Sequence, residues 1–275
     1  QEASKGITPP YELPSAEAMT APERIAIDFG SAKELETSVA KAIECIDDDR
    51  PAAWRLARGK SVFRGYEAPG KIAFLFPGQG SQYVNMLREL RDISPTVRRI
   101  FDEADDVMRD RLDGRTLTQL IFVDSTDKEL LANAEEALRH TTVTQPAMLA
   151  ADNALASLLQ DFGIFPDMVI GHSLGEYAAL VAAGVMPFAD ALVAVSARAR
   201  EMANVSLADS GKMAGVIGQY DKIPPVLEKV GGYVVAANRN SYKQTVIAGA
   251  SDAVDKASDM LRDVGFCVIP LNVSH

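Results

Sequence analysis

The sequence predicts an α/β fold, with a large subdomain built on a parallel sheet and a small ferredoxin-like subdomain. Three observations support this prediction. An apolar run at 72–76 stops at Pro77-Gly78, as expected of a strand buried on both faces of a parallel sheet. A second short apolar run passes through Gly171 directly into an alanine-rich helix former, the strand, turn and helix order of α/β proteins. From residue 212 onwards the pattern follows the order β-α-β-β-α-β.

The chain before this body divides into two parts. Residues 1–22 hold four prolines among small and polar residues, a composition that builds no packed element, so we expect a flexible linker. A short apolar run and then a helical pattern follow, and the pattern ends before Pro51. Residues 23–70 are therefore predicted to form a small strand and helix unit with a packing role.

The main body is predicted to consist of a large α/β subdomain at 71–210 and the ferredoxin-like subdomain at 211–270. Helical periodicity dominates the large subdomain between its two buried strands. We expect residues 271–275 to begin a return to the large subdomain, because an inserted small domain has to return to its host. A continuation of the chain is therefore expected.

Composition and charge disfavour several classes of partner. The 275 residues carry a formal net charge of −10, which argues against nucleic acid because phosphate binding requires clustered Lys and Arg. The two cysteines, Cys45 and Cys267, lack the spacing of a zinc site or a disulfide framework, so no metal is expected. There is no apolar run of the roughly 18 to 20 residues that a membrane span needs, and no signal-peptide pattern. We expect a cytoplasmic protein without a membrane partner.

The strongest chemical signal is the segment Gly171-His172-Ser173-Leu174-Gly175, a Gly-x-Ser-x-Gly pattern between a predicted strand and a predicted helix. We expect glycines beside the serine because the turn is sharp and neighbouring backbone comes close. The serine then projects at a helix N-terminus, where N–H groups and the helix dipole can stabilise an oxyanion. The pattern also occurs as an incidental turn, but its flanking elements favour a nucleophile elbow of the α/β-hydrolase type with Ser173 as catalytic residue.

A second signal is the glycine-rich loop from Phe76 to Gln82, with the sequence Phe-Pro-Gly-Gln-Gly-Ser-Gln, at the C-terminal end of a predicted strand. Open α/β sheets bind their ligands at that end. The loop lacks the Gly-Lys-Ser/Thr ending of a nucleotide-binding loop, so a phosphate cradle is the weaker interpretation. A backbone N–H near Gln79 could supply a second oxyanion donor, and a plain turn is the remaining alternative.

These motifs resemble the malonyl-CoA:acyl-carrier-protein transacylase family in their order and spacing. The resemblance rests on the loop at 76–82, Thr-Gln-Pro-Ala at 144–147, Gly-His-Ser-Leu-Gly-Glu at 171–176, and Asn238-x-Asn240 ahead of Val-Ile-Ala-Gly. It covers the chain from about Lys71 onwards. Residues 23–70 resemble, more loosely, the linker before the acyltransferase domain of a modular polyketide or polyunsaturated fatty-acid synthase, which favours a multidomain origin with an adjacent ketosynthase domain.

The resemblance implies a ping-pong acyl transfer. Ser173 takes an acyl group from coenzyme A and passes it to the phosphopantetheine thiol of an acyl carrier protein. Malonyl-CoA is the implied donor, and no permanently bound cofactor is implied. The backbone amides of Gln79 and Leu174 match the family's oxyanion hole, and Gln145 of the Thr-Gln-Pro-Ala motif is an implied substrate-binding residue.

Arg198 matches the arginine that pairs with the malonyl carboxylate in the family. The helical pattern is compatible with this role. With the core stripe centred among the apolar residues of this helix, at about 100° per residue, Arg198 sits roughly 80° from its centre and Arg200 roughly 120°. Arg198 can therefore border a pocket, whereas Arg200 is expected to meet solvent. A planar guanidinium suits bidentate binding of a carboxylate. Without the resemblance, two surface arginines would be an equal alternative.

Three histidines are candidates for the catalytic base. His172 adjoins Ser173 and leaves the backbone in another direction, so we expect it to line the pocket and not to accept the serine proton. His140 lies in a polar loop and is expected to be exposed. His275 resembles the first residue of the family's His-Ala-Phe-His segment, which is associated with malonyl selectivity, and the catalytic histidine is the last residue of that segment, beyond residue 275. Leu174, where methylmalonyl-selecting relatives commonly have Gln, also favours malonyl.

Two other functions stay open at this point. A serine hydrolase such as a thioesterase shares the elbow but passes the acyl group to water. Such an esterase needs neither the loop at 76–82, nor Arg198, nor the ferredoxin-like insert. The second alternative is a non-catalytic module or a catalytically incomplete fragment of a synthase.

Overall fold

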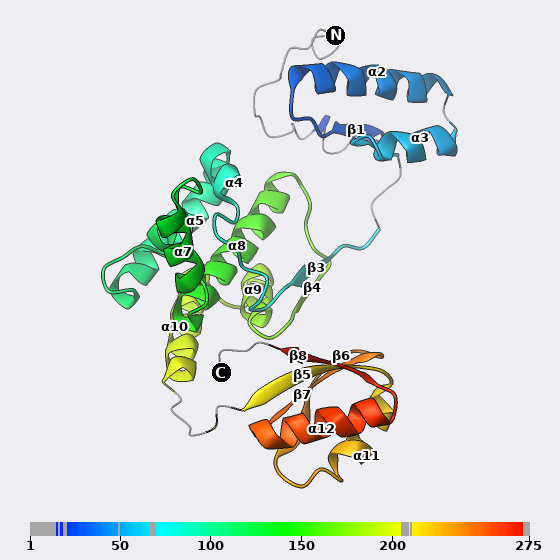
Figure 1. Ribbon diagram of the computed structural model, residues 1–275. Helices are drawn as coiled ribbons and strands as arrows, with labels where there is room; N and C mark the ends of the chain where they lie inside the picture. The colour runs from blue at the N-terminus through cyan, green and yellow to red at the C-terminus, as the bar shows by residue number, and fades with distance from the viewer. Residues whose placement is uncertain are drawn as a thin grey trace. The chain divides into compact units, whose positions relative to one another are not determined.

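The computed structural model describes residues 15, 17–18, 21–48, 50–66, 70–204, 209 and 211–271 (Figure 1). Contacts divide the chain into two compact units. The first consists of Gln1–Gly78, Leu87–Glu103 and Ala150–Pro187, and the second of Gln79–Met86, Ala104–Leu149 and Phe188–His275.

The first unit begins with a small strand and helix layer. Strands β1 (Arg24–Ile27) and β2 (Val62–Gly65) pair antiparallel, and α2 (Ala32–Asp48) and α3 (Pro51–Arg58) lie between them in sequence. Its core consists of Ala42, Cys45, Ala57 and Val62, with Ile27, Ala53 and Trp54 packed against it. The sequence predicted one strand and one helix; the structure adds the strand β2 and the helix α3. Helix α3 starts at a proline, since the first turn of a helix needs no N–H from that residue.

The parallel pair of strands that carries the elbow follows. Strands β3 (Ala73–Phe76) and β4 (Met168–Gly171) pair parallel, with Phe76 opposite Gly171. Helix α9 (Gly175–Ala182) packs against both strands. The expectation of burial on both faces is wrong for the described residues. Phe74 and Phe76 are buried, but Leu75 is 71% exposed, because an apolar run cannot tell whether a second layer covers the other face.

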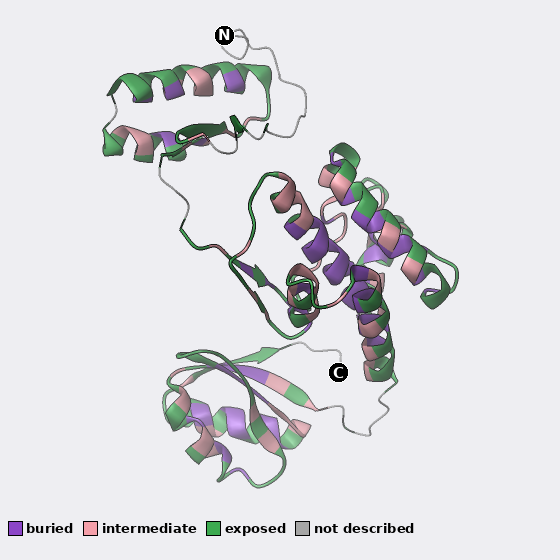
Figure 2. Cartoon of the chain, turned by 180° about the vertical axis from the view of Figure 1, so that it is seen from behind, coloured by how far each residue is buried: buried purple, intermediate pink, exposed green. Residues whose placement is uncertain are grey.

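Helices make up most of the remaining described residues before 204. They are α4 (Arg88–Ile93), α5 (Pro95–Met108), the 3-10 helix η2 (Arg109–Arg111), α6 (Leu117–Ile121), α7 (Lys128–Ala137), α8 (Thr141–Asp161) and α10 (Phe188–Ala203). Helix α8 is the longest of these, and Figure 2 shows that it is buried over much of its length. Its polar residues Thr141 and Gln145 are therefore shielded from water.

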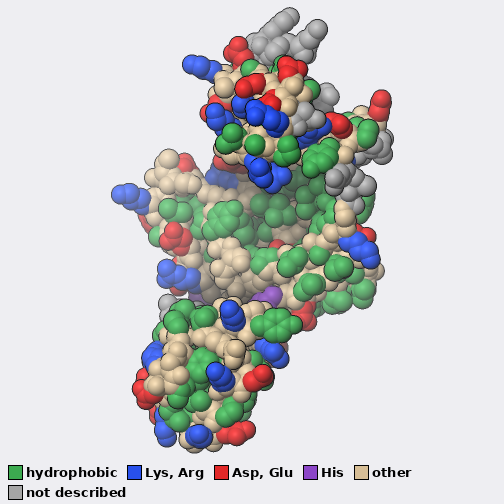
Figure 3. All heavy atoms as spheres, turned by 90° about the vertical axis from the view of Figure 1, so that its right-hand side faces the viewer, with side chains coloured by type: hydrophobic (Ala, Val, Ile, Leu, Met, Phe, Trp, Pro, Cys, Tyr) green, Lys and Arg blue, Asp and Glu red, His purple; other side chains and the backbone are tan. Residues whose placement is uncertain are grey.

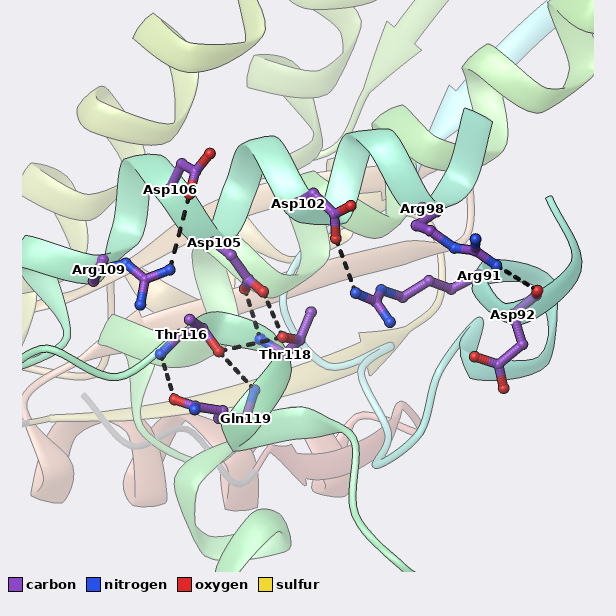
Figure 4. Close-up of polar contacts among 10 residues, drawn as sticks. All are labelled: Arg91, Asp92, Arg98, Asp102, Asp105, Asp106, Arg109, Thr116, Thr118 and Gln119. Carbon is purple, nitrogen blue, oxygen red and sulfur yellow. Dashed lines mark hydrogen bonds and ion pairs between the residues drawn. The ribbon is translucent and has the colours of Figure 1, made fainter. Parts of the chain in front are cut away.

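Polar contacts fix the start of α6, and others join side chains nearby (Figure 4). At α6, a capping box joins Thr116 and Gln119, in which each side chain accepts from the other residue's backbone N–H. Asp105 of α5 also accepts hydrogen bonds from the N–H and the hydroxyl of Thr118. Within the first unit, Arg91 bonds Asp102 at 2.9 Å. The contacts at the start of α6 satisfy backbone N–H groups that a helix end would otherwise leave unpaired.

The last part of the chain forms the ferredoxin-like subdomain. Its elements are β5 (Lys212–Ile217), η3 (Tyr220–Lys222), α11 (Pro224–Leu227), β6 (Val234–Ser241), β7 (Gln244–Gly249), α12 (Ser251–Asp263) and β8 (Cys267–Leu271). The four strands form an antiparallel sheet in the order β6-β7-β5-β8. The predicted β-α-β-β-α-β order is confirmed. The core lies between this sheet and the two helices, with Val216, Ile247, Ala257 and Leu261 fully buried.

Two further features bear on the function classes. No helix among the described residues is both long and apolar enough to cross a membrane. On the face of the molecule drawn in Figure 3, basic and acidic side chains are interspersed and not gathered by sign.

Candidate active site

Ser173 occupies a strained backbone position. It follows β4 and precedes α9, and its φ of 53° lies in the left-handed region. A non-glycine residue in this region costs about 1 to 3 kcal/mol, and such residues cluster at functional sites. The residue is exposed. The unusual backbone conformation therefore places an accessible hydroxyl at the turn between strand and helix, as in a nucleophile elbow.

The glycines on either side of Ser173 are required by close approach of the backbone. A Cβ added to Gly171 would lie 2.3 Å from the backbone N of Glu176. One added to Gly175 would lie 2.2 Å from the carbonyl O of Phe76. Distances under 3.0 Å are essentially never seen for real Cβ atoms. The expected reason for the two glycines is confirmed.

Gly78, which follows β3 in the same unit, also lies against the elbow. A Cβ on Gly78 would be 2.8 Å from the carbonyl O of His172 and 3.6 Å from the Cβ of Ser173. The N–H of His172 donates to the carbonyl O of Phe76 at 3.0 Å. Phe76 and Gly78 are thus held to the elbow by close contacts, and a side chain larger than hydrogen at Gly78 would disrupt them.

The two predicted oxyanion donors have available N–H groups. In the elbow, the N–H of Gly175 donates to His172 and that of Glu176 to Ser173, at 2.9 and 3.1 Å. Within the described part of the chain, no hydrogen bond is donated by the N–H of Leu174 or by that of Gln79. An N–H without an acceptor at a helix N-terminus is suited to a developing negative charge.

A chain of hydrogen bonds joins Arg198 to the glycine-rich loop in the second unit. Arg198 Nη1 donates to Gln145 Oε1 at 2.7 Å, and Gln145 Nε2 donates to Thr141 Oγ1 at 2.7 Å. Thr141 Oγ1 in turn donates to Gln79 Oε1 at 3.3 Å. Gln145 Nε2 also contacts Met202 Sδ at 3.4 Å. Gln145 is 0% exposed and Thr141 is 1% exposed, so the middle of this chain is shielded from water.

Helix α10 presents Arg198 as the helical pattern predicts. Phe188, Leu192, Val195 and Ala199 form its buried stripe. Arg198 is half-buried at the side of this stripe, whereas Arg200 is exposed. The hydrogen bond to Gln145 fixes one edge of the guanidinium, which leaves its other donors for a planar anion.

Two of the three histidines, His140 and His172, lie within the described residues, and both are exposed. His140 is exposed, as expected, with its Nε2 3.8 Å from Glu136 Oε1. His172 is also exposed. His275 lies outside the described residues. Among the described residues there is no group of three or more His, Cys, Asp or Glu side chains that could hold a metal ion.

Sequence reasoning missed two polar residues of α8. Thr141 precedes Gln145 by one helical turn, so i, i+4 spacing could have placed the two side chains side by side. Asp152 is 7% exposed, and its Oδ2 has no hydrogen-bond partner within the residues the structure describes. Burial raises the pKa of the Asp152 carboxyl to about 7. No sequence signal distinguishes this aspartate from a solvated one.

A sequence model described as the acyl transferase domain matches residues 73–274. The chain belongs to this family. It is 41% identical over 209 residues to the malonyl CoA-acyl carrier protein transacylase of Bacillus subtilis, covering 74% of this chain and 62% of that protein. It is 40% identical over 221 residues to the phenolphthiocerol synthesis polyketide synthase Pks15/1 of Mycobacterium marinum, covering 80% of this chain and 10% of that one. The chain thus spans just under two thirds of the transacylase.

Solved structures agree with this membership. The acyltransferase domain from the second module of the salinomycin polyketide synthase superposes with a TM-score of 0.73 at 29% identity, over 94% of this chain and 55% of that chain. The transacylase of Streptococcus pneumoniae gives 0.64 at 43% identity, over 74% and 63%. A third, PlMCAT, gives 0.65 at 38% identity over 74% and 63%, and was solved in complex with AntF, a type II acyl-carrier protein. The predicted α/β fold and the family resemblance are therefore confirmed.

Proposed function

We propose that this chain is an acyltransferase that loads malonyl from malonyl-CoA onto Ser173 and passes it to an acyl carrier protein. The observation that carries the proposal is the strained elbow, in which Ser173 has a φ of 53° between two glycines that admit no Cβ. The related transacylases and synthase domains support acyl transfer over the hydrolase alternative.

The proposed reaction has two balanced steps. Ser173 Oγ attacks the thioester carbonyl, the C–S bond breaks, and coenzyme A leaves as its thiol with the serine proton. The phosphopantetheine thiol of the carrier then attacks the serine ester and regenerates the hydroxyl. The transfer is redox-neutral, and we propose that it uses no permanently bound cofactor. We assign the general base to the last histidine of the family segment that begins at His275, and not to His172 or His140.

Each other residue has a proposed role. The N–H groups of Gln79 and Leu174 stabilise the oxyanion of the tetrahedral intermediate. Arg198 binds the malonyl carboxylate through the guanidinium donors that Gln145 leaves available. Because Gln145 is buried and both ends of its amide already have partners, we assign it to orienting Arg198, not to touching substrate. We propose that His172 lines the acyl pocket and that His275 contributes to the selectivity for malonyl.

The cellular setting is part of the same proposal. The partner is a carrier protein with a phosphopantetheine arm, since a transacylase relative is known in complex with one. We propose an adjacent ketosynthase domain because the chain is similar to part of longer synthases, and a cytoplasmic location because both of its cysteines are free.

Loading of Ser173 can be measured directly. The protein is exposed to malonyl-CoA, quenched and analysed by intact mass and peptide mapping, and we expect one malonyl group on Ser173. Ser173→Ala should abolish it. Ser173→Gly is the matched variant, because glycine accepts a positive φ that alanine does not, so it should lose loading while being about 1 kcal/mol more stable than Ser173→Ala.

The second half of the reaction distinguishes transferase from hydrolase. Addition of a phosphopantetheinylated carrier protein should discharge the adduct and yield malonyl-carrier. Discharge to free malonate at the same rate with or without the carrier would identify a hydrolase. A malonyl group on any other residue would contradict the assignment of Ser173.

A further inference from the structure

Thr141 is placed between the two parts of the proposed machinery that belong to the second unit. It is the first residue of α8 and is 1% exposed. Its hydroxyl contacts the side chains of Gln145 and Gln79 and, in the described part of the chain, bonds to no backbone group. The hydroxyl therefore does not serve as a helix cap, and its two partners are both residues of proposed function.

The directions of these hydrogen bonds are determined by donor and acceptor chemistry. A guanidinium carries donors only, so Gln145 must present Oε1 to Arg198. Its Nε2 then faces the other way, with one N–H to Thr141 Oγ1 and the other to Met202 Sδ. Because the Thr141 oxygen already accepts, its own proton is available for Gln79 Oε1. The four residues thus form one directed chain of donors and acceptors.

Each end of this chain is a residue to which we assign a different role in the reaction. Gln145 fixes one edge of the Arg198 guanidinium, which in our proposal binds the malonyl carboxylate. The side chain of Gln79 belongs to the residue whose N–H is a proposed oxyanion donor. The Thr141–Gln79 bond is the longest in the chain at 3.3 Å, so the anchoring of Gln79 is its weakest link.

We propose that Thr141 is a positioning residue that couples the carboxylate-binding Arg198 to the oxyanion loop at Gln79. This inference rests on the proposed function. Removing the hydroxyl leaves a buried Gln145 N–H without an acceptor, which is energetically unfavourable. The Gln145 amide is then expected to rotate, and its hydrogen bond no longer holds the Arg198 guanidinium in one orientation. The same change releases the side chain of Gln79.

Thr144 provides a matched control on the same helix. It is a buried threonine one residue before Gln145, but its hydroxyl donates to the backbone oxygens of Leu138 and His140. Thr144→Val and Thr141→Val therefore remove the same group from equally buried positions. Only the second change touches the chain that leads to Arg198.

The test measures single-turnover loading of Ser173 by malonyl-CoA and by acetyl-CoA, which lacks the carboxylate. Thr141→Val should slow loading with both donors and lower the malonyl-to-acetyl rate ratio about tenfold. Thr141→Ser, which keeps the hydroxyl, should restore the ratio. Thr144→Val should lower stability and leave the ratio unchanged. In an Arg198→Ala background, Thr141→Val should no longer change the ratio, since no guanidinium remains to be positioned.

Other outcomes overturn the inference. An unchanged ratio in Thr141→Val, a ratio lowered equally by Thr144→Val, or no restoration by Thr141→Ser would each make Thr141 merely structural. If Thr141→Val does not fold, Thr141→Ala removes the same hydroxyl without branching at Cβ and is read in the same way. Absence of any Ser173 adduct in the unchanged protein would instead contradict the proposed function and this inference with it.

Discussion

The elbow at 171–175 and the polar chain of Gln79, Thr141, Gln145 and Arg198 achieve precision by different means. The elbow uses backbone packing, both within residues 171–175 and against Phe76 of β3, with glycines where no Cβ fits. The polar chain uses side chains from a loop and two helices, joined through buried hydrogen bonds. The difference shows that placing the nucleophile depends on close packing of backbone, whereas placing the arginine depends on hydrogen bonds between buried side chains.

The largest effect is expected from the elbow. In Gly175→Ala, the new Cβ would lie 2.2 Å from the carbonyl O of Phe76, a backbone atom that cannot rotate away. We expect Ser173 loading to fall by more than about 100-fold and stability by about 1 to 3 kcal/mol, as in overpacked cores. Mass-detected loading and a urea unfolding curve measure the two losses.

A glycine with open space around an added Cβ gives the control for that change. Gly65 of β2 has nothing within 4 Å of an added Cβ, and Gly65→Ala should leave loading unchanged. Equal behaviour of the two alanine variants would show that close approach at Gly175 does not shape the elbow.

Arg198→Ala tests the polar chain at its functional end. Malonyl loading should fall on the order of 100-fold, because the substrate carboxylate loses its charged partner, while acetyl loading should change little. Arg200→Ala is the control, since Arg200 is exposed on the same helix. Equal losses with malonyl-CoA and acetyl-CoA would assign Arg198 a structural role.

Asp152 tests whether a buried polar side chain on α8 lowers the stability of the fold when it lacks a hydrogen-bond partner. Gln145 has partners at both ends of its amide, whereas Asp152 Oδ2 has none within the described residues. The Asp152 pKa is raised to about 7 in the folded state, against 3.8 for the ordinary group. Between these values the folded state binds the proton and the unfolded state does not. The free energy of unfolding therefore falls as pH rises from about 4 to about 7.

Asp152→Asn should remove that fall. The stability difference between Asp152→Asn and the unchanged protein should shift in favour of the variant by on the order of 4 kcal/mol between pH 4 and pH 8. Urea unfolding across that range measures it. Asp106→Asn, at an exposed position, controls for the loss of one negative charge. Parallel profiles for Asp152→Asn and the unchanged protein would contradict the burial effect.

Patterns of short range in the sequence predicted their structures well. The apolar spacing of α10 predicted both its buried stripe and the different exposures of Arg198 and Arg200. The order of strand and helix patterns from residue 212 onwards predicted the ferredoxin-like order of elements. By contrast, the apolar run of β3 predicted burial on two faces, and only one face is buried in the part of the chain that is described. Burial depends on neighbouring layers, which a strand's own residues do not encode.

The sequence by itself determined the elbow, because the close approach of backbone at this strand-to-helix turn requires glycines at 171 and 175, on either side of Ser173. It also determined the helical face of Arg198, since the period of a helix is a local property. Only the tertiary structure decided which buried polar groups have hydrogen-bond partners. Both ends of the Gln145 amide have one, whereas Asp152 Oδ2 has none among the described residues. The partner of a buried polar side chain is whatever packing brings within about 3 Å, and that distance is set by residues far apart in the chain.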